Sequence, residues 1–459
     1  MSRTTVRAGG RSVSPAEGGA TAPVWSAPRE AAPAARSARQ LTPVVSVAPS
    51  APSPATVHDG DGTRRLRVAL YSHDAMGLGH VRRNLAIARS FAALDPTPDI
   101  LLLTGAPEAV TANRPENCDL VALPALVKDA DGAYGARHLS VGEEQMLTMR
   151  RSILTAALTT FRPDVLVVDK HPRGFRGELE PALEALAGTG TRVVLGLRDV
   201  LDDAETARRE WVRDRSTSAL RRWYDQVWVY GDSRVHDVVG DLDLPAVLRE
   251  RVVHTGYLAH GRGDGQRRST SVTGPYVLAT VGGGADGAAL AEVFARVPLP
   301  SGHRGVLVLG PQMPAAQRRR VERLAAGRTD LDVHTYVDDA PALLAGAAAV
   351  VAMGGYNTVC EAMARRVRLL VVPRVAPRAE QLVRARLLAR AGMLDYLLPS
   401  RLSPAALGGW LARAVDPAET RPDHHSPRPD RTAVDLDGLA RLPELLTSLV
   451  GLEERTDVA

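Results

Sequence analysis

The stretch LRVALYSHDAMGLGHVRRNLAIA, residues 66–88, joins a short apolar run to a glycine-containing loop and then to a helix-like sequence. The chain repeats this order at residues 275–297, PYVLATVGGGADGAALAEVFARV. A strand that feeds a glycine-rich turn and a helix is the opening unit of a Rossmann-like domain. The sequence therefore predicts two such domains, one in each half of the chain.

Each half continues with further short apolar runs. They begin near residues 99, 164, 192 and 226 in the first half and near residues 305, 331, 348 and 368 in the second. Near-continuous apolar runs are typical of strands buried on both faces of a parallel sheet. We therefore expect an α/β protein whose two Rossmann-like domains face a central cleft, where ligands of such folds bind.

Composition sets the expected domain boundaries. Residues 1–64 are rich in Ala, Pro and Ser without apolar periodicity, which predicts a disordered extension. We expect an N-terminal domain over residues 65–255, a polar linker over 256–274 and a C-terminal domain over 275–459. In the last domain, Ser403 and Pro404 are typical of a helix start, and residues 436–449 predict a closing helix.

Charge and cysteine content exclude several protein classes. The net charge of +5 comes from scattered arginines that are not interleaved with aromatic residues, so we expect no nucleic-acid partner. Cys118 and Cys360 are too isolated for a disulfide framework or a metal motif. No apolar run reaches the roughly 18 residues of a membrane span, and the N-terminus does not resemble a signal peptide. We expect a soluble cytoplasmic protein without a metal or cofactor.

The glycine run after the strand at residues 276–280 predicts a phosphate site. Gly282, Gly284 and Gly287 satisfy G-x-G-x-x-G. A dinucleotide site would also need an acidic residue about 20 positions later, at the end of the next strand. The chain has Gly310 and Pro311 there. Phosphate contact remains open, and so does the alternative that the glycines only allow close packing of strand and helix.

A second anion site is predicted in VVAMGGYNTVCEAM, residues 350–363. A strand ends in two glycines and a helix follows, with Asn357 or Thr358 as its expected N-cap. Glu361 then lies one turn into the helix, where its carboxylate could accept both hydroxyls of a ribose. The alternative is a capping box, because Thr358-x-x-Glu361 has that spacing as well.

Residues 335–381, TYVDDAPALLAGAAAVVAMGGYNTVCEAMARRVRLLVVPRVAPRAEQ, resemble the nucleotide-sugar half of MurG-like glycosyltransferases of the GT-B fold. Residues 66–93 resemble the glycine loop and histidine that open those enzymes. The resemblance implies inverting, metal-independent transfer of a sugar from a nucleoside-diphosphate donor, UDP-linked, to an acceptor hydroxyl. A UDP-sugar hydrolase, an epimerase and a non-catalytic sugar-nucleotide-binding module remain alternatives.

The resemblance also implies which residues bind the donor. Glu361 would hold the ribose, Tyr336 and Val337 would pack on the uracil, and Glu380 with Gln381 would reach the sugar. The remaining candidates surround the diphosphate: Gly282, Gly283, Gly284, Gly354, Gly355, Asn357 and Thr358. Arg384 is a departure, because MurG-like proteins commonly carry a polar amide there.

The first loop is expected to face the acceptor. An imidazole can take a proton from a hydroxyl near neutral pH, so His80 is the predicted general base, with Asp74 as a substitute base or an orienting partner. The alternative for His80 is a helix-capping or phosphate-orienting role. Arg82 and Arg83 are either solvated helix residues or contacts for an anionic acceptor.

Further acceptor contacts are expected where polar residues follow strands, although such residues are also common in ordinary loops. A lipid-linked acceptor would bring peripheral membrane contact, but the sequence does not identify the acceptor or the sugar. The candidate acceptor-binding residues are Gly77, Gly79, Arg83, His171, Arg173, Arg198 and Asp199.

Overall fold

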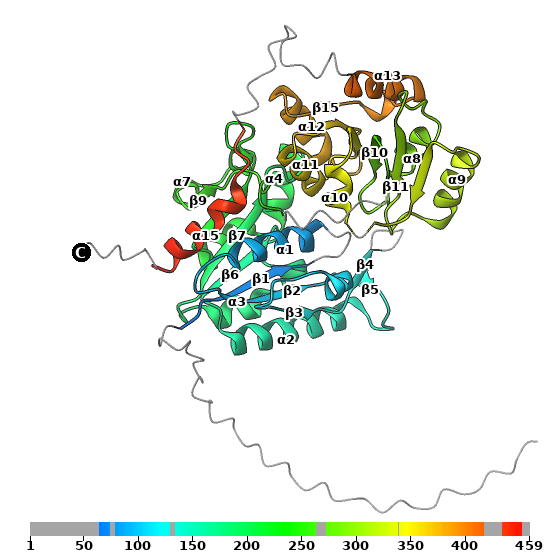
Figure 1. Ribbon diagram of the computed structural model, residues 1–459. Helices are drawn as coiled ribbons and strands as arrows, with labels where there is room; N and C mark the ends of the chain where they lie inside the picture. The colour runs from blue at the N-terminus through cyan, green and yellow to red at the C-terminus, as the bar shows by residue number, and fades with distance from the viewer. Residues whose placement is uncertain are drawn as a thin grey trace, which may run out of the picture. The chain divides into compact units, whose positions relative to one another are not determined.

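Two parallel sheets, each flanked by helices, organise the chain in the computed structural model (Figure 1). The structure describes residues 64–73, 79–128, 134–262, 272–337, 339–416 and 434–451. Asp74, Gly77 and all of the expected disordered extension except Arg64 lie outside the described residues. The described part of the chain belongs to one unit, Val57–Ala459.

Within these ranges the first sheet has seven strands in the order β3-β2-β1-β6-β7-β8-β9, and the second has six in the order β12-β11-β10-β13-β14-β15. A separate antiparallel hairpin pairs β4 (Leu126–Lys128) with β5 (Tyr134–Ala136). The strands of the first sheet are β1 Arg67–Ser72, β2 Asp99–Thr104, β3 Cys118–Ala122, β6 Val165–Asp169, β7 Arg192–Arg198, β8 Gln226–Tyr230 and β9 Val252–His254. Those of the second are β10 Tyr276–Thr280, β11 Arg304–Val308, β12 Leu331–His334, β13 Ala349–Ala352, β14 Arg368–Val371 and β15 Asp395–Tyr396.

Most of the parallel strands are connected through an α-helix, the usual crossover between parallel strands, whereas β2 and β3 are joined through a short 3₁₀ helix, Pro107–Thr111. Ser403 caps α13 by accepting a hydrogen bond from the Ala406 amide, which confirms the predicted helix start. None of the helices among the described residues is both long and apolar enough to cross a bilayer. The helices are α1 Gly79–Phe91, α2 Glu143–Phe161, α3 Glu180–Leu186, α4 Ala204–Arg213, α5 Ser216–Trp223, α6 Val238–Asp241, α7 Ala246–Arg249, α8 Ala288–Phe294, α9 Ala315–Ala325, α10 Ala340–Ala345, α11 Tyr356–Ala364, α12 Glu380–Arg390, α13 Pro404–Val415 and α15 Gly438–Leu449.

The order of the strands reverses at one point in each sheet. In the first sheet the chain moves outward from β1 through β2 and β3 and then returns to place β6 on the other side of β1. The second sheet repeats this arrangement with β10 and β13. Loops that leave the carboxyl ends of such neighbouring strands diverge and leave a crevice, which is where ligands bind in open α/β sheets.

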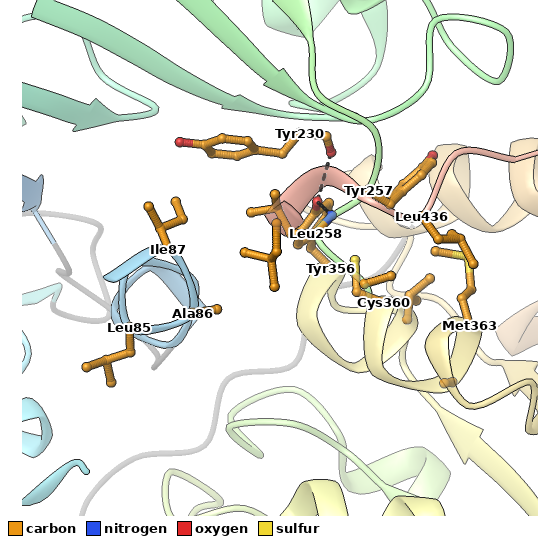
Figure 2. Packing of buried hydrophobic residues seen from close by; sticks show 14 of the residues in the cluster. Leu85, Ala86, Ile87, Tyr230, Tyr257, Leu258, Tyr356, Cys360, Met363 and Leu436 are labelled. Carbon is orange, nitrogen blue, oxygen red and sulfur yellow. Dashed lines mark hydrogen bonds between the residues drawn. The ribbon is translucent and has the colours of Figure 1, made fainter. Parts of the chain in front are cut away.

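A buried cluster links the two halves of this unit (Figure 2). The hydroxyl of Tyr356, at the start of α11, donates to the Tyr230 carbonyl at 2.8 Å and accepts from the Leu258 amide at 3.1 Å. Tyr257 and Leu258 are buried, although both lie in the expected polar linker. The described beginning of that stretch is therefore part of the core.

The closing helix α15 packs on α1 rather than on the second sheet (Figure 1). Leu439, Leu442 and Leu446 of α15 are buried in the same cluster as Ile87 and Phe91 of α1. The chain thus returns to its first half after completing the second. The apolar spacing of residues 436–449 predicts this helix but not the surface that it covers.

Candidate active site

A cavity of about 340 Å³ lies at the carboxyl ends of the central strands, between residues of the two halves. Most of the predicted site residues line it. The first half contributes Gly79, His80, Arg82, Arg83 and Arg198, and the second contributes Gly282, Gly283, Tyr336, Val337, Gly355, Asn357, Thr358, Glu361, Glu380 and Gln381. Two segments that are far apart in sequence therefore form one concave site.

His80 is held by a buried carboxylate from the neighbouring strand. Its Nδ1 lies 2.6 Å from Oδ2 of Asp169, the last residue of β6, which pairs directly with β1. Arg83, one turn along α1 from His80, lies 2.6 Å from the other oxygen of Asp169. Because the carboxyl ends of β1 and β6 meet at one sheet edge, the fold brings these three side chains together.

Asp169 is ionised in this environment. Burial disfavours its charge, but Arg83 and His80 outweigh that effect and lower the pKa of Asp169 below its usual value. An ionised carboxylate that accepts from Nδ1–H leaves Nε2 as the ring nitrogen that can take a proton. Sequence analysis did not identify Asp169 as the partner of His80. The available signal was its position at the end of an apolar strand.

The glycine run after β10 contains residues in two different environments. Gly282 and Gly284 both have positive φ, +65° and +94°, which favours glycine. A Cβ atom at Gly284 would lie 2.3 Å from the Leu309 carbonyl, whereas one at Gly282 would meet no atom within 4 Å. Gly284 is therefore needed for close packing, while Gly282 lies beside the cavity with space for a ligand.

Helix α11 begins earlier than expected. Its N-cap is Gly355, so Asn357 and Thr358 lie in the first helical turn and the predicted N-cap assignment was wrong. Thr358 consequently cannot act as the capping residue of a Thr358-x-x-Glu361 box. The structure removes the capping-box alternative for Glu361, whose side chain is buried and lines the cavity.

Glu361 instead takes part in ion pairs. Its Oε1 accepts from Arg82 Nη2 at 2.7 Å and lies 3.8 Å from Arg262 Nη1. Arg262 also donates to the Asn357 side chain at 2.8 Å, and the amide of Asn357 donates to the Gly79 carbonyl at 2.9 Å. The first turns of α1 and α11 are therefore joined by polar contacts on both sides of Glu361.

Glu380 and Gln381 are the first two residues of α12, and both line the cavity. Arg198 donates to Glu380 at 2.6 Å, and the Arg374 backbone amide donates to the Gln381 side chain at 2.9 Å. Burial opposes the charge of Glu380, but the surrounding cations, Arg198 first, lower its pKa to about 2. Its carboxylate is thus an ionised hydrogen-bond acceptor at neutral pH.

Arg384, the residue that departs from the family pattern, does not line the cavity. Its guanidinium is buried, donates to both oxygens of Asp199 at 2.8 to 3.0 Å and reaches the Gly354 carbonyl at 3.2 Å. Asp199 was predicted to face an acceptor, but it is occupied by this pair. The pair holds the loop after β7 against the loop after β13.

Other predicted residues also lie away from the cavity lining. Gly354 has φ +87°, and a Cβ atom there would lie 2.7 Å from the Val371 side chain. His171 packs edge-on against His73, with 4.7 Å between ring centroids, and Arg173 forms an ion pair with Glu180. Gly284, Gly354, His171, Arg173 and Asp199 therefore surround the cavity without lining it.

Across the described ranges, no group of three or more His, Cys, Asp or Glu side chains could hold a metal ion. Residues 280–433 match the glycosyltransferase family 28 C-terminal domain. No curated protein sequence matches the chain.

Several solved structures have a similar fold. MurG of Acinetobacter baumannii is 16% identical with a TM-score of 0.50, over 83% of this chain and 99% of that one. The glycosyltransferase VinC, in complex with DTDP, is 16% identical with a TM-score of 0.52, over 85% and 100%. A putative UDP-N-acetylglucosamine 2-epimerase from Listeria monocytogenes is 11% identical with a TM-score of 0.57, over 86% and 98%. The chain therefore has the GT-B fold, and its residues 280–433 are similar to the glycosyltransferase family 28 C-terminal domain, as expected from the resemblance to MurG-like enzymes.

Proposed function

We propose that this protein is an inverting, metal-independent glycosyltransferase that moves a sugar from a UDP-linked donor to an acceptor hydroxyl. The observation that carries the proposal is the composition of one cavity. It is lined by His80, with its carboxylate partner, from the first half, and by Gly282, Glu361 and the start of α11 from the second. A candidate proton acceptor and a candidate nucleotide site therefore share one space.

The second half supplies the groups that a nucleoside-diphosphate sugar needs. The diphosphate would lie against the Gly282–Gly283 turn and the first turn of α11, where the N–H groups that open the helix and the helix dipole favour an anion. The uracil would pack on Tyr336 and Val337, which line the cavity. The ribose would bind Glu361, and the sugar hydroxyls would bind Glu380 and Gln381. The matched family domain supports this assignment.

The first half supplies the base. Nε2 of His80 takes the proton from the acceptor hydroxyl, and the oxygen attacks the anomeric carbon of the donor. The bond from that carbon to the diphosphate oxygen breaks, and its electron pair leaves with UDP. The products are the inverted glycoside, UDP and a protonated His80, which keeps its contact with the Asp169 carboxylate. Backbone donors at the start of α11 stabilise the departing diphosphate in place of a metal.

Nucleotide binding and UDP release test the proposal. Thermal shifts across UDP-, dTDP- and GDP-sugars identify the donor, and UDP release is then followed with EDTA present, with and without a panel of sugar, phenol and sugar-phosphate acceptors. Acceptor-dependent release, with an inverted anomeric proton signal by NMR, is the expected result. Release without acceptor indicates a hydrolase or an epimerase, and binding without release indicates a non-catalytic module.

A further inference from the structure

Among the described residues, four arginines line the cavity, and three of them are at most 24% exposed and pair with Asp169, Glu380 or Asp286. Arg83 is buried on Asp169, Arg198 pairs with Glu380, and Arg374 pairs with Asp286 at 2.9 Å and lies 3.4 Å from Glu380. Their side chains are 2%, 13% and 24% exposed. These guanidiniums have little freedom to move toward a ligand.

Arg82 differs in its exposure and in the carboxylate with which it pairs. Its side chain is 37% exposed, the most of the four, and its partner is Glu361, which the proposed function assigns to the donor ribose. Ribose hydroxyls that bind Glu361 would compete directly with the guanidinium of Arg82. Where a ribose hydroxyl takes the place of Arg82 at Oε1 of Glu361, nucleotide binding would displace a cation that already lies inside the cavity.

A second arginine keeps the carboxylate in place when Arg82 leaves. Arg262 Nη1 lies 3.8 Å from the same oxygen of Glu361, and the Arg262 side chain is only 7% exposed. Its position is set by the hydrogen bond to Asn357 and by the Tyr356 ring, 5.7 Å from the guanidinium carbon. Glu361 thus retains a charged neighbour while Arg82 is free to move.

The new position for Arg82 follows from distance and charge. Asn357 and Thr358, in the first turn of α11, lie four and three residues before Glu361, a rise of about 5–6 Å that a long, flexible arginine side chain can cover. The diphosphate proposed to lie there carries negative charge that backbone dipoles neutralise only in part. Because Arg82 belongs to α1, in the first half of the chain, it would contact the diphosphate from the side that is proposed to hold the acceptor.

We propose that Arg82 is a donor-binding residue. When the ribose of the nucleotide binds Glu361, the Arg82 guanidinium leaves Glu361 and binds the diphosphate. The inference rests on the proposed function and adds a cation to the diphosphate site from the first half of the chain. It also couples the two halves, because the residue lies only two positions after His80. Donor binding would then draw the start of α1 toward the diphosphate.

Uridine and UDP distinguish this exchange from a structural ion pair. Uridine has the ribose but no phosphate, so its binding would break the Arg82–Glu361 ion pair without providing a phosphate for Arg82 to contact. Arg82→Gln should therefore bind uridine about 2–5-fold more tightly, the scale of a lost exposed ion pair. The same variant should bind UDP about 10–100-fold more weakly, the scale of a lost charged hydrogen bond. Titration calorimetry of the full chain measures both dissociation constants.

Two control variants distinguish an effect of the Arg82 guanidinium from a general loss of positive charge. Arg89→Gln removes a charge from the same helix, where Arg89 donates to the Asn113 carbonyl away from the cavity, and should leave both affinities unchanged. Arg82→Lys keeps the charge and should recover part of the UDP affinity. Equal changes in uridine and UDP affinity for Arg82→Gln, or no change in UDP affinity, would overturn the exchange while leaving the donor site intact. Absence of UDP binding to the unmodified protein would instead overturn the proposed function and the exchange with it.

Discussion

Nδ1 of His80 lies 2.6 Å from Oδ2 of Asp169, and the two residues leave the carboxyl ends of neighbouring strands in the first sheet. The contact orients the imidazole of His80 at the wall of the cavity, so that Nδ1 faces Asp169 and Nε2 does not. The nitrogen that faces Asp169 keeps its proton, and the other can accept one. Asp169 also neutralises Arg83, so one carboxylate serves both the proposed chemistry and the stability of the fold.

His80→Ala should reduce turnover while preserving donor binding. The proposed base is lost, which typically lowers kcat by about 10²–10⁴, whereas the proposed nucleotide contacts all lie elsewhere in the cavity. UDP affinity should stay within about twofold, because no charged donor contact is removed. Acceptor-dependent turnover and UDP titration on the same preparation provide the check. Lost UDP affinity with unchanged kcat would instead identify the first loop as a phosphate cradle.

Asp169→Asn should reduce turnover and stability together. An amide can present N–H to Nδ1 and favour the wrong tautomer, so we expect kcat to fall by about 10²–10⁴. The buried Arg83 also loses its charged partner, which should cost about 3–5 kcal/mol of unfolding free energy. Urea denaturation separates the two effects, because His80→Ala retains the Arg83 pair. Equal stability of the two variants would argue against this account of Asp169.

Glu361→Ala should weaken UDP binding by about 2 kcal/mol, the scale of a hydrogen bond to a charged group. The residue caps no helix, but its loss leaves Arg262, only 7% exposed, without its carboxylate neighbour, so we also expect a moderate fall in thermal stability. Calorimetric titration with UDP and thermal unfolding measure the two quantities. Glu322→Ala is a suitable control, because it removes an exposed carboxylate paired with Arg318 at 3.8 Å, outside the cavity. Unchanged UDP affinity in Glu361→Ala would remove this carboxylate from the donor site.

Arg384→Met should destabilise the fold by about 3–5 kcal/mol, because it leaves Asp199 charged, buried and without its partner. Adding Asp199→Asn removes that charge, so the double variant should be more stable than Arg384→Met alone. Such non-additivity is expected for residues in direct contact. The midpoints and slopes of urea unfolding curves for the two single variants and the double variant test it. A double variant as unstable as the sum of the single effects would contradict the proposed coupling.

Lys170 should make stability depend on pH above neutrality. Burial and then Arg198 lower its pKa to about 8, below the ordinary value for lysine. Between about pH 8 and pH 10 the unfolded chain therefore binds more protons at this site than the folded protein, and stability from this group rises with pH. Lys170→Met should be more stable than the unmodified protein at pH 7, and the difference should shrink toward pH 10. Parallel denaturation series of both proteins test this trend, which a constant difference would contradict.

The parallel sheets could be predicted from the sequence because buried strands need continuous apolar runs and close turns need glycine. β7 spans Arg192–Arg198, the whole of one predicted run, and Gly282 and Gly355 stand where strands feed helices. Strands β3 and β9 were not predicted. β3 is short and partly exposed, and β9 has only three residues, so neither has a continuous buried pattern.

The pairings inside the site could be seen only in the folded chain. Asp169 lies 86 residues from Arg83, Arg384 lies 185 from Asp199, and Glu361 lies 279 from Arg82. The local spacing of residues contains no information about partners so far apart in sequence. The capping-box pattern at Thr358 and Glu361 pointed instead to a local partner, which the helix start at Tyr356 excludes. Residue types and periodicity determined the sheets and most of the cavity lining. Which charges meet was decided by the strand order, because it places loops from distant segments at the same sheet edge.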